Sequence, residues 1–357
     1  MSMRILSPAE KLPLEIIPEI LKFHVTENFE PPERLLLVCR SWHAAALMTR
    51  ELWGYILLLL ENHHARFDTK KTYPQYQVCC TSAQVKRAVQ RAARVPLDLC
   101  VVWSDSEHTS WGRTIQRVDK IIPLVKTIEW KAFVPRLRSL TMEAEDHLIW
   151  MNLPDDVFGL WDFSRLEVLK TSNERLLDKA MQDSRHLSRL KIPGISLKYI
   201  KSNKFPASIR HLHIFKMHMT VLRLSEITQL VSLELTGDLM QGAPRDTLLQ
   251  LQELYLHGCA PFWPIDCPNL LRLRLHPKVT SYVGYEPAEI ISLPLLRELE
   301  YISSSQLSLL RFFHAPQLVT LDIQEKGYRK QETYDALNEI WPPSPLSTGV
   351  EQTQLRP

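Results

Sequence analysis

The sequence contains little glycine, and this scarcity argues against the common phosphate-binding folds. Only 10 of its 357 residues are glycine, and they are scattered along the chain. Loops that cradle phosphates need clustered glycines so that the backbone can approach the phosphate oxygens closely. The nearest pair, Gly237 and Gly242, is followed by Ala243 and Pro244, where a P-loop requires lysine and then serine or threonine. We therefore do not expect a nucleotide-binding domain of the Walker or Rossmann type.

Cysteines and long apolar runs are scarce as well. The six cysteines form no CxxC pair, so the sequence offers neither a disulfide framework nor a zinc-ribbon motif. The N-terminal residues lack the apolar run of a signal peptide, and the longest apolar stretch, Tyr55–Leu60, is far shorter than a membrane span. The formal net charge of +3 is low for a dedicated nucleic-acid binder. We expect a protein of the cytoplasm or nucleus that contacts neither membrane nor nucleic acid.

Residues 12–60 have the apolar pattern of three short helices. Pro13 stands where the first helix would begin, and Glu30-Pro31-Pro32 separates the first helix from the second. Three such helices are marginally stable alone and have more apolar surface than so small a bundle can bury. A surplus of this kind is normally covered by something else. The apolar positions are Ile16, Ile17, Ile20, Leu21 and Phe23, then Leu35, Leu36, Val38, Cys39, Trp42, Ala45 and Ala46, then Leu52, Trp53 and Ile56.

These residues resemble the F-box, most closely the F-box-like modules of large fungal families. The matching pieces are Leu12–Leu21, Leu35–Trp42 and Glu51–Trp53. The resemblance implies binding to the Skp adaptor of a Skp–cullin–F-box ubiquitin ligase. The contacts that it implies by motif position are Leu12, Pro13, Glu15, Ile16, Ile20, Leu36, Val38, Trp42 and Trp53. The alternative is a helical cap on the rest of the chain, in which Trp42 and Trp53 are core residues.

Beyond residue 95 the chain repeats the unit apolar-x-x-apolar-x-apolar. From Leu166 onward the first positions lie 19 to 26 residues apart, a spacing close to that of leucine-rich repeats. The fourth and sixth positions are two residues apart, so a strand turns both to one side, and stacked parallel strands bury them in one core. The units begin at Leu137, Leu166, Leu187, Ile209, Leu230, Leu251, Leu270, Leu296 and Leu318.

The repeats depart from the usual leucine-rich pattern in one respect. Standard repeats place Asn or Cys three residues after the last strand leucine. Only Cys259 fits that position, and Asn173 misses it by one residue. We therefore predict an α/β protein with an N-terminal three-helix F-box and an irregular leucine-rich-repeat-like solenoid with a parallel concave sheet. The predicted divisions are the F-box (1–60), linking helices and first atypical strands (61–133), the solenoid (134–341) and a disordered tail (342–357).

The strand residues between the leucines would face outward, where charge alternates in blocks along the solenoid. Such patterning suits recognition of a partner with complementary charges. We expect a protein substrate to dock around Tyr255, Arg272 and Arg274, with His211 and His213 on the same face. The alternative is that these are ordinary solvated strand residues. A lone His-x-His pair without a carboxylate or thiolate partner does not predict a metal site.

The sequence contains no local signature of a catalytic triad or nucleophile, so we predict a binding protein without a cofactor. Combined with the resemblance, this predicts a substrate receptor that binds the Skp adaptor, and through it a cullin–RING ligase, by its helices. Its solenoid would hold an unknown protein substrate, and its contribution would be proximity. The alternative is a leucine-rich scaffold that assembles proteins without ubiquitin transfer.

Overall fold

The computed structural model divides the chain into two compact units, residues 1–187 and 188–357, and each is described by itself. Glu15, Cys259 and the predicted tail lie outside the described residues. The structure describes residues 12–13, 16–27, 36–61, 77–79, 81–104, 134–144, 161–193, 205–215, 227–237, 246–258, 265–276, 290–303, 310 and 313–325.

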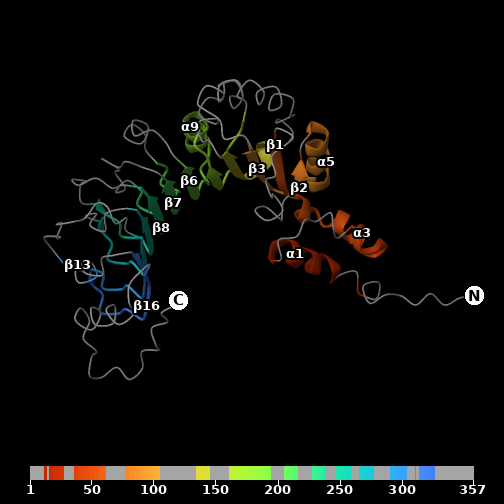
Figure 1. The fold of residues 1–357 in the computed structure, drawn as a ribbon. Helices are drawn as coiled ribbons and strands as arrows, with labels where there is room; N and C mark the ends of the chain where they lie inside the picture. The colour runs from red at the N-terminus through yellow and green to blue at the C-terminus, as the bar shows by residue number, and fades with distance from the viewer. Residues whose placement is uncertain are drawn as a thin grey trace, which may run out of the picture. The chain divides into compact units, whose positions relative to one another are not determined.

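The first unit begins with two α-helices, α1 (Ile17–Glu27) and α3 (Arg40–Met48), which pack against each other (Figure 1). The third predicted helix is only the four-residue 3-10 helix η2 (Arg50–Trp53). Ile56, assigned to that helix from its apolar spacing, lies in strand β1 (Tyr55–Glu61). Because a short apolar run fits a buried strand as well as a helix, the apolar spacing alone does not distinguish the two at Ile56. The boundary predicted at residue 60 therefore falls inside this strand.

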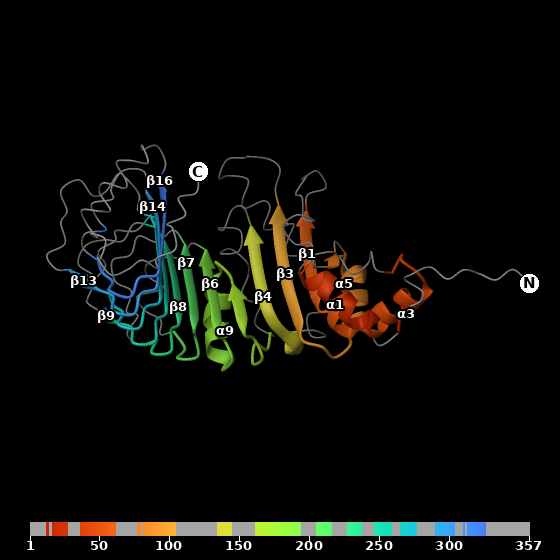
Figure 2. The ribbon, with the colours of Figure 1, turned by 90° about the horizontal axis from the view of Figure 1, so that it is seen from below.

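A parallel sheet forms the centre of the first unit, with its strands in the order β2-β1-β3-β4-β5 (Figure 2). The pairing register aligns Ile56, Leu99, Leu140 and Leu169 across four neighbouring strands. All four side chains are buried, so one row of apolar contacts runs through this part of the core. The remaining strands are β2 (Gln77–Cys79), β3 (Leu97–Ser104), β4 (Leu137–Ala144) and β5 (Val168–Lys170).

Two further helices of this unit begin at polar caps. Helix α5 (Ser82–Ala92) starts with a capping box, in which Thr81 and Gln84 each accept a hydrogen bond from the other's backbone N–H. Helix α9 (Glu174–Asp183) starts at buried Asn173, whose side-chain oxygen accepts a hydrogen bond from Leu176 N at 2.8 Å. Asn173 thus satisfies backbone groups although it misses the expected repeat position by one residue.

The second unit is a parallel-strand solenoid, as the repeats predict. Its long strands pair in chain order and in parallel, and their fourth- and sixth-position side chains are buried. Leu321, which is half-buried, is the exception. These strands are β6 (Arg189–Pro193), β7 (His211–Phe215), β8 (Ser232–Thr236), β10 (Glu253–His257), β12 (Arg272–His276), β14 (Glu298–Ser303) and β16 (Thr320–Glu325). Two-residue strands add two small pairs, β9 (Asp246–Thr247) with β11 (Ile265–Asp266) and β13 (Ile291–Ser292) with β15 (Phe313–His314).

A tight turn precedes each of the strands β7, β8, β10, β12, β14 and β16. The first-position leucine or isoleucine donates its backbone N–H to the carbonyl three residues earlier, at 3.1–3.2 Å. Most residues at that earlier position are themselves buried, for example Ile227, Leu248 and Leu293. Three prolines, Pro268, Pro294 and Pro316, occupy the next position, the second residue of a β-turn, where their fixed φ is favourable. Each repeat therefore begins earlier than the leucine spacing indicates.

One backbone carbonyl joins each repeat of the second unit to the next. This shared carbonyl belongs to the second residue of the repeat and accepts two consecutive N–H groups from the following repeat, at 2.8–3.1 Å. Arg210 O, for example, accepts from the N–H groups of Val231 and Ser232. The same arrangement occurs at Ser188, Val231, Gln252, Leu271 and Arg297.

In the part of the chain that the structure describes, no helix is long and apolar enough to cross a membrane.

Candidate protein-binding surfaces

Large apolar side chains on the described surface are concentrated in the N-terminal helices of the first unit and in the residues directly before them. Among the described residues, six of the nine exposed large hydrophobic side chains lie between residues 16 and 48, and Leu37 and Met48 are 84% and 80% exposed. Exposing apolar surface of this kind to water costs free energy. Such surface is usually covered by a binding partner. The six are Ile16, Phe23, Leu37, Val38, Leu47 and Met48. We call them the helical apolar set.

The residues predicted to contact an adaptor fall into three groups by exposure. Pro13, Ile16 and Val38 are exposed. Trp53 alone is fully buried. The half-buried members are Leu12, Ile20, Leu36 and Trp42. The segment before α3 is held to that helix by a contact of 3.2 Å between His43 Nδ1 and the Leu36 carbonyl.

Trp53 requires a correction to its predicted role, because its side chain offers no surface to a partner. Its indole N–H donates to the Ala46 carbonyl of α3 at 2.9 Å. The Arg91 guanidinium of α5 lies over the ring, 4.8 Å from its centroid. Trp53 therefore connects α3, η2 and α5 from the inside, as a buried aromatic residue with a satisfied N–H does. In this structure Trp53 contributes to the packing of the first unit and not to its exposed surface.

Arg272, on the solenoid face of the second unit, lies between two carboxylates of neighbouring strands. The register aligns Glu253, Arg272 and Glu298 on β10, β12 and β14. The Arg272 guanidinium is 3.2 Å from Glu253 and 2.8 Å from Glu298. Glu298 first, and Glu253 second, raise the pKa of Arg272. Its charge is thus already matched within the chain.

The next row on the same face has the same pattern with an aromatic residue in place of one acid. The register aligns Tyr255, Arg274 and Glu300. Arg274 forms an ion pair with Glu300, and its guanidinium lies 5.1 Å from the centroid of the Tyr255 ring. These two rows, six residues in all, form what we call the charged ladder. They bring together the predicted docking residues Tyr255, Arg272 and Arg274.

The predicted histidines belong to an earlier part of the same sheet. His213 of β7 is buried, its Nδ1 lies 2.8 Å from Glu234 Oε2, and its ring packs on Phe215 with the centroids 3.7 Å apart. Burial is the main cause that raises the pKa of Glu234. Burial also lowers the pKa of the half-buried His211. His213 thus serves the strand packing, whereas His211 remains partly accessible.

A scan against protein-family models and a search of curated proteins find no match for this chain. The helical apolar set and the charged ladder are therefore interpreted from their own chemistry. Among the described residues, no group of three or more His, Cys, Asp or Glu side chains could hold a metal ion.

The sequence reasoning missed the acidic half of the charged ladder. The sequence predicts acidic blocks on either side of the arginine block, whereas in the structure Glu253, Glu298 and Glu300 are the partners of the two arginines. The signal was present, because Glu253, Arg272 and Glu298 each occupy the third position of a repeat. Residues at one repeat position become lateral neighbours in a parallel solenoid.

Proposed function

We propose that this protein is an F-box-like receptor subunit of a Skp–cullin–F-box ubiquitin ligase. Its N-terminal helices would bind the Skp adaptor. Its second unit, a leucine-rich-repeat-like solenoid, would hold a protein substrate on the charged ladder. The chain itself would perform no chemistry. It would bring the substrate within reach of the ubiquitin-charged enzyme and so raise the local concentration of the substrate.

The helical apolar set is the observation that carries the proposal. These side chains lie in the same segment whose sequence resembles the F-box, and two of them, Ile16 and Val38, are among the predicted adaptor contacts. Burying one such side chain at an interface is worth about 1.5–3 kcal/mol. A partner with an apolar groove would remove this surface from water.

The charged ladder supports substrate binding of a particular kind. Its arginines are held by carboxylates on the same face, so a ligand with one uniform charge would have to break existing ion pairs. A protein segment that alternates acidic and basic side chains could instead extend the alternating rows, and Tyr255 could provide an aromatic contact. This favours a protein substrate over a nucleic acid.

The test is co-purification of the full chain with the Skp adaptor and cullin of the same organism. Ile16→Asp and Val38→Asp each place a charge in the helical apolar set without changing a buried residue. We expect each change to weaken adaptor capture by roughly tenfold or more, because a carboxylate would be buried at the interface. The matched control is Val319→Asp, which alters an exposed valine of the second unit and should leave capture unchanged.

Trp53→Ala is not a suitable probe of docking. Removing a fully buried indole leaves a cavity that costs about 3–5 kcal/mol, so capture could be lost through unfolding. If the unmodified chain failed to capture the adaptor, or if Ile16→Asp and Val38→Asp captured it normally, the docking proposal would be wrong. Retention of solenoid partners in that case would favour the alternative of a scaffold without ubiquitin transfer.

A further inference from the structure

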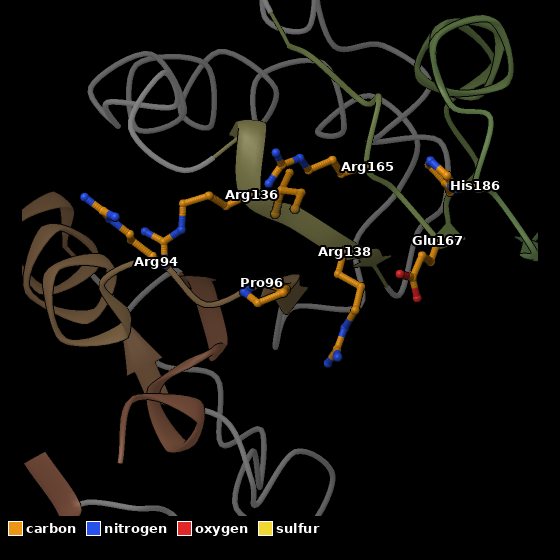
Figure 3. Close-up of a pocket in the computed structure, with 8 residues that line it drawn as sticks. Arg94, Pro96, Arg136, Arg138, Arg165, Glu167 and His186 are labelled. Carbon is orange, nitrogen blue, oxygen red and sulfur yellow. The ribbon is translucent and has the colours of Figure 1, made fainter. Parts of the chain in front are cut away.

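A pocket of about 270 Å³ in the first unit has four arginines among its eight lining residues (Figure 3). It lies where three parallel strands begin, because its residues precede or start β3, β4 and β5. Arg94 and Pro96 come from the turn after α5, Arg136 from the turn directly before β4, Arg138 from the start of β4, and Arg165 from the segment before β5. Leu137, Glu167 and His186 complete the lining. None of these residues belongs to the helical apolar set or the charged ladder.

Two of the four arginines are fixed by partners within the chain. Arg138 forms hydrogen bonds with both carboxylate oxygens of the buried Asp98, so its charge is matched. Arg136 donates from Nε and Nη2 to the Val95 carbonyl at 3.2 and 2.9 Å. A carbonyl orients the guanidinium but carries no net charge, so the charge of Arg136 is not neutralised there. Partial burial lowers the pKa of Arg136, as expected for a cation without a counter-ion.

The other two arginines, Arg94 and Arg165, are exposed. Among the described residues, neither side chain forms a hydrogen bond or an ion pair. The lining contains four arginines and Glu167, and Asp98 pairs with Arg138, so two positive charges remain on the lining. Asp162, a described residue outside the lining, interacts electrostatically with Arg165 but forms no ion pair with it. Cations held this close repel each other, and a bound anion would relieve the repulsion.

The number and type of donors favour phosphate over a carboxylate. A guanidinium donates two parallel N–H bonds to one anionic group, and the three oxygens of a phosphate monoester can be approached from several sides at once. Arg94, Arg136 and Arg165 come from three separate segments that all contribute to the pocket lining (Figure 3). A carboxylate has only two oxygens and one charge to offer.

The size of the pocket limits what can be attached to the phosphate. Pockets for drug-sized molecules are roughly 300–1,000 Å³, so this one suits a smaller compound. Pro96 and the buried Leu137 provide an apolar wall for a short carbon skeleton. We propose that this pocket binds the phosphate group of a small phosphorylated compound, with Arg94, Arg136 and Arg165 as its ligands and Arg138 held in place by Asp98.

The test is isothermal titration calorimetry of the full chain with inorganic phosphate and with pyrophosphate. We expect saturable binding of both, tighter for pyrophosphate because of its higher charge. The variant Arg94→Gln/Arg165→Gln should weaken binding by roughly tenfold or more, since it removes two charge-assisted donors. Both residues are exposed, so the fold should be retained, and circular dichroism checks this. Arg185→Gln, which changes an exposed arginine outside the lining, is the matched control and should bind as the unmodified chain does.

Three results would overturn the proposal. One is no binding of either anion by the folded chain. A second is equal weakening in the Arg185→Gln control, which would indicate general charge attraction. The third is binding of a phosphoserine peptide without binding of free phosphate or pyrophosphate, which would assign the pocket to a modified protein segment instead. Loss of adaptor capture would not bear on these outcomes, since the lining lies outside α1 and α3.

Discussion

Arg138 of β4 holds Asp98 of β3 through two hydrogen bonds, Nε to Oδ1 at 3.0 Å and Nη2 to Oδ2 at 2.5 Å. The ion pair lies at an irregularity of the sheet. The register aligns Leu97 with Leu137 but Asp98 with Ser139, so Arg138 is the extra residue of a β-bulge. The hydrogen bond to Asp98 is the main cause that raises the pKa of Arg138. The bulge thus points a cation at the adjacent strand.

Replacing this cation should destabilise the first unit. Arg138→Met leaves the buried Asp98 carboxylate without its partner, and we expect the free energy of unfolding to fall by about 1–3 kcal/mol. Urea unfolding followed by tryptophan fluorescence measures the change. Adding Asp98→Asn removes the unpaired charge and should restore part of the loss. Strictly additive effects of the two substitutions would contradict a direct coupling.

We expect a side chain at Gly54 to be destabilising because a backbone atom lies too close to it. Its φ of −72° is ordinary, but a Cβ there would lie 2.9 Å from the Pro96 carbonyl oxygen, a backbone atom. We expect Gly54→Ala to lower the free energy of unfolding by about 1–3 kcal/mol through overpacking. Gly258 is the useful comparison, because its φ is +72° while the nearest atom is 3.8 Å away. Gly258→Asn should cost about 1 kcal/mol or less, since Asn adopts this conformation. The opposite order in chemical denaturation would refute the explanation.

Three of the described cysteines, Cys39, Cys100 and Cys267, should differ sharply in reactivity. Burial raises the pKa of Cys100 and of Cys267 to about 12, so both thiols stay protonated at pH 8, whereas Cys39 is partly exposed. Because the thiolate is the nucleophile, we expect iodoacetamide to modify Cys39 in the native protein and to spare the other two. Peptide mass spectrometry identifies the modified sites, and the urea-unfolded chain serves as the control in which all three react. Equal labelling of Cys100 and Cys39 in the native protein would contradict this expectation and show that the core of the first unit opens readily.

The charged ladder allows a test that separates stability from recognition. Arg272→Glu/Arg274→Glu places like charges side by side on neighbouring strands, so we expect it to lower the free energy of unfolding and to reduce the set of captured proteins. Arg272→Glu/Glu298→Arg keeps an ion pair between β12 and β14 but reverses its polarity, so it should lose less stability and still alter the captured set. Affinity purification with mass spectrometry compares the two. An unchanged set of partners in both variants would exclude docking at this face.

The inward residues of the solenoid could be predicted because their spacing has a direct physical meaning. Leu254 and Leu256 are two residues apart on one strand, and both are buried. The turn before each strand was missed because its acceptor positions are chemically mixed. Leu248, Cys267 and Ala315 all occupy the same place, and only the backbone bond reveals their equivalence. Strand β1 was missed in part because pairing with β3, some 40 residues away, outweighs local spacing.

The candidate binding surfaces were predictable in composition but less so in geometry. Val38 and Arg272 are exposed, in agreement with the predicted surface positions. Trp53 could not be placed from the sequence, because Arg91 of a later helix helps to enclose it. The arginine pocket has no sequence signature either, since its lining comes from segments between residues 94 and 186 that only the sheet brings together.

The shared carbonyl has an evolutionary consequence. Since the successive repeats of the second unit offer the same acceptor to the next repeat, a whole repeat could be duplicated or deleted and the two new neighbours would still find matching backbone partners. Loss of a single residue within a strand would instead turn every following side chain of that strand to the wrong face. The length of such a chain can therefore change in steps of one repeat, while the interior of each repeat stays fixed.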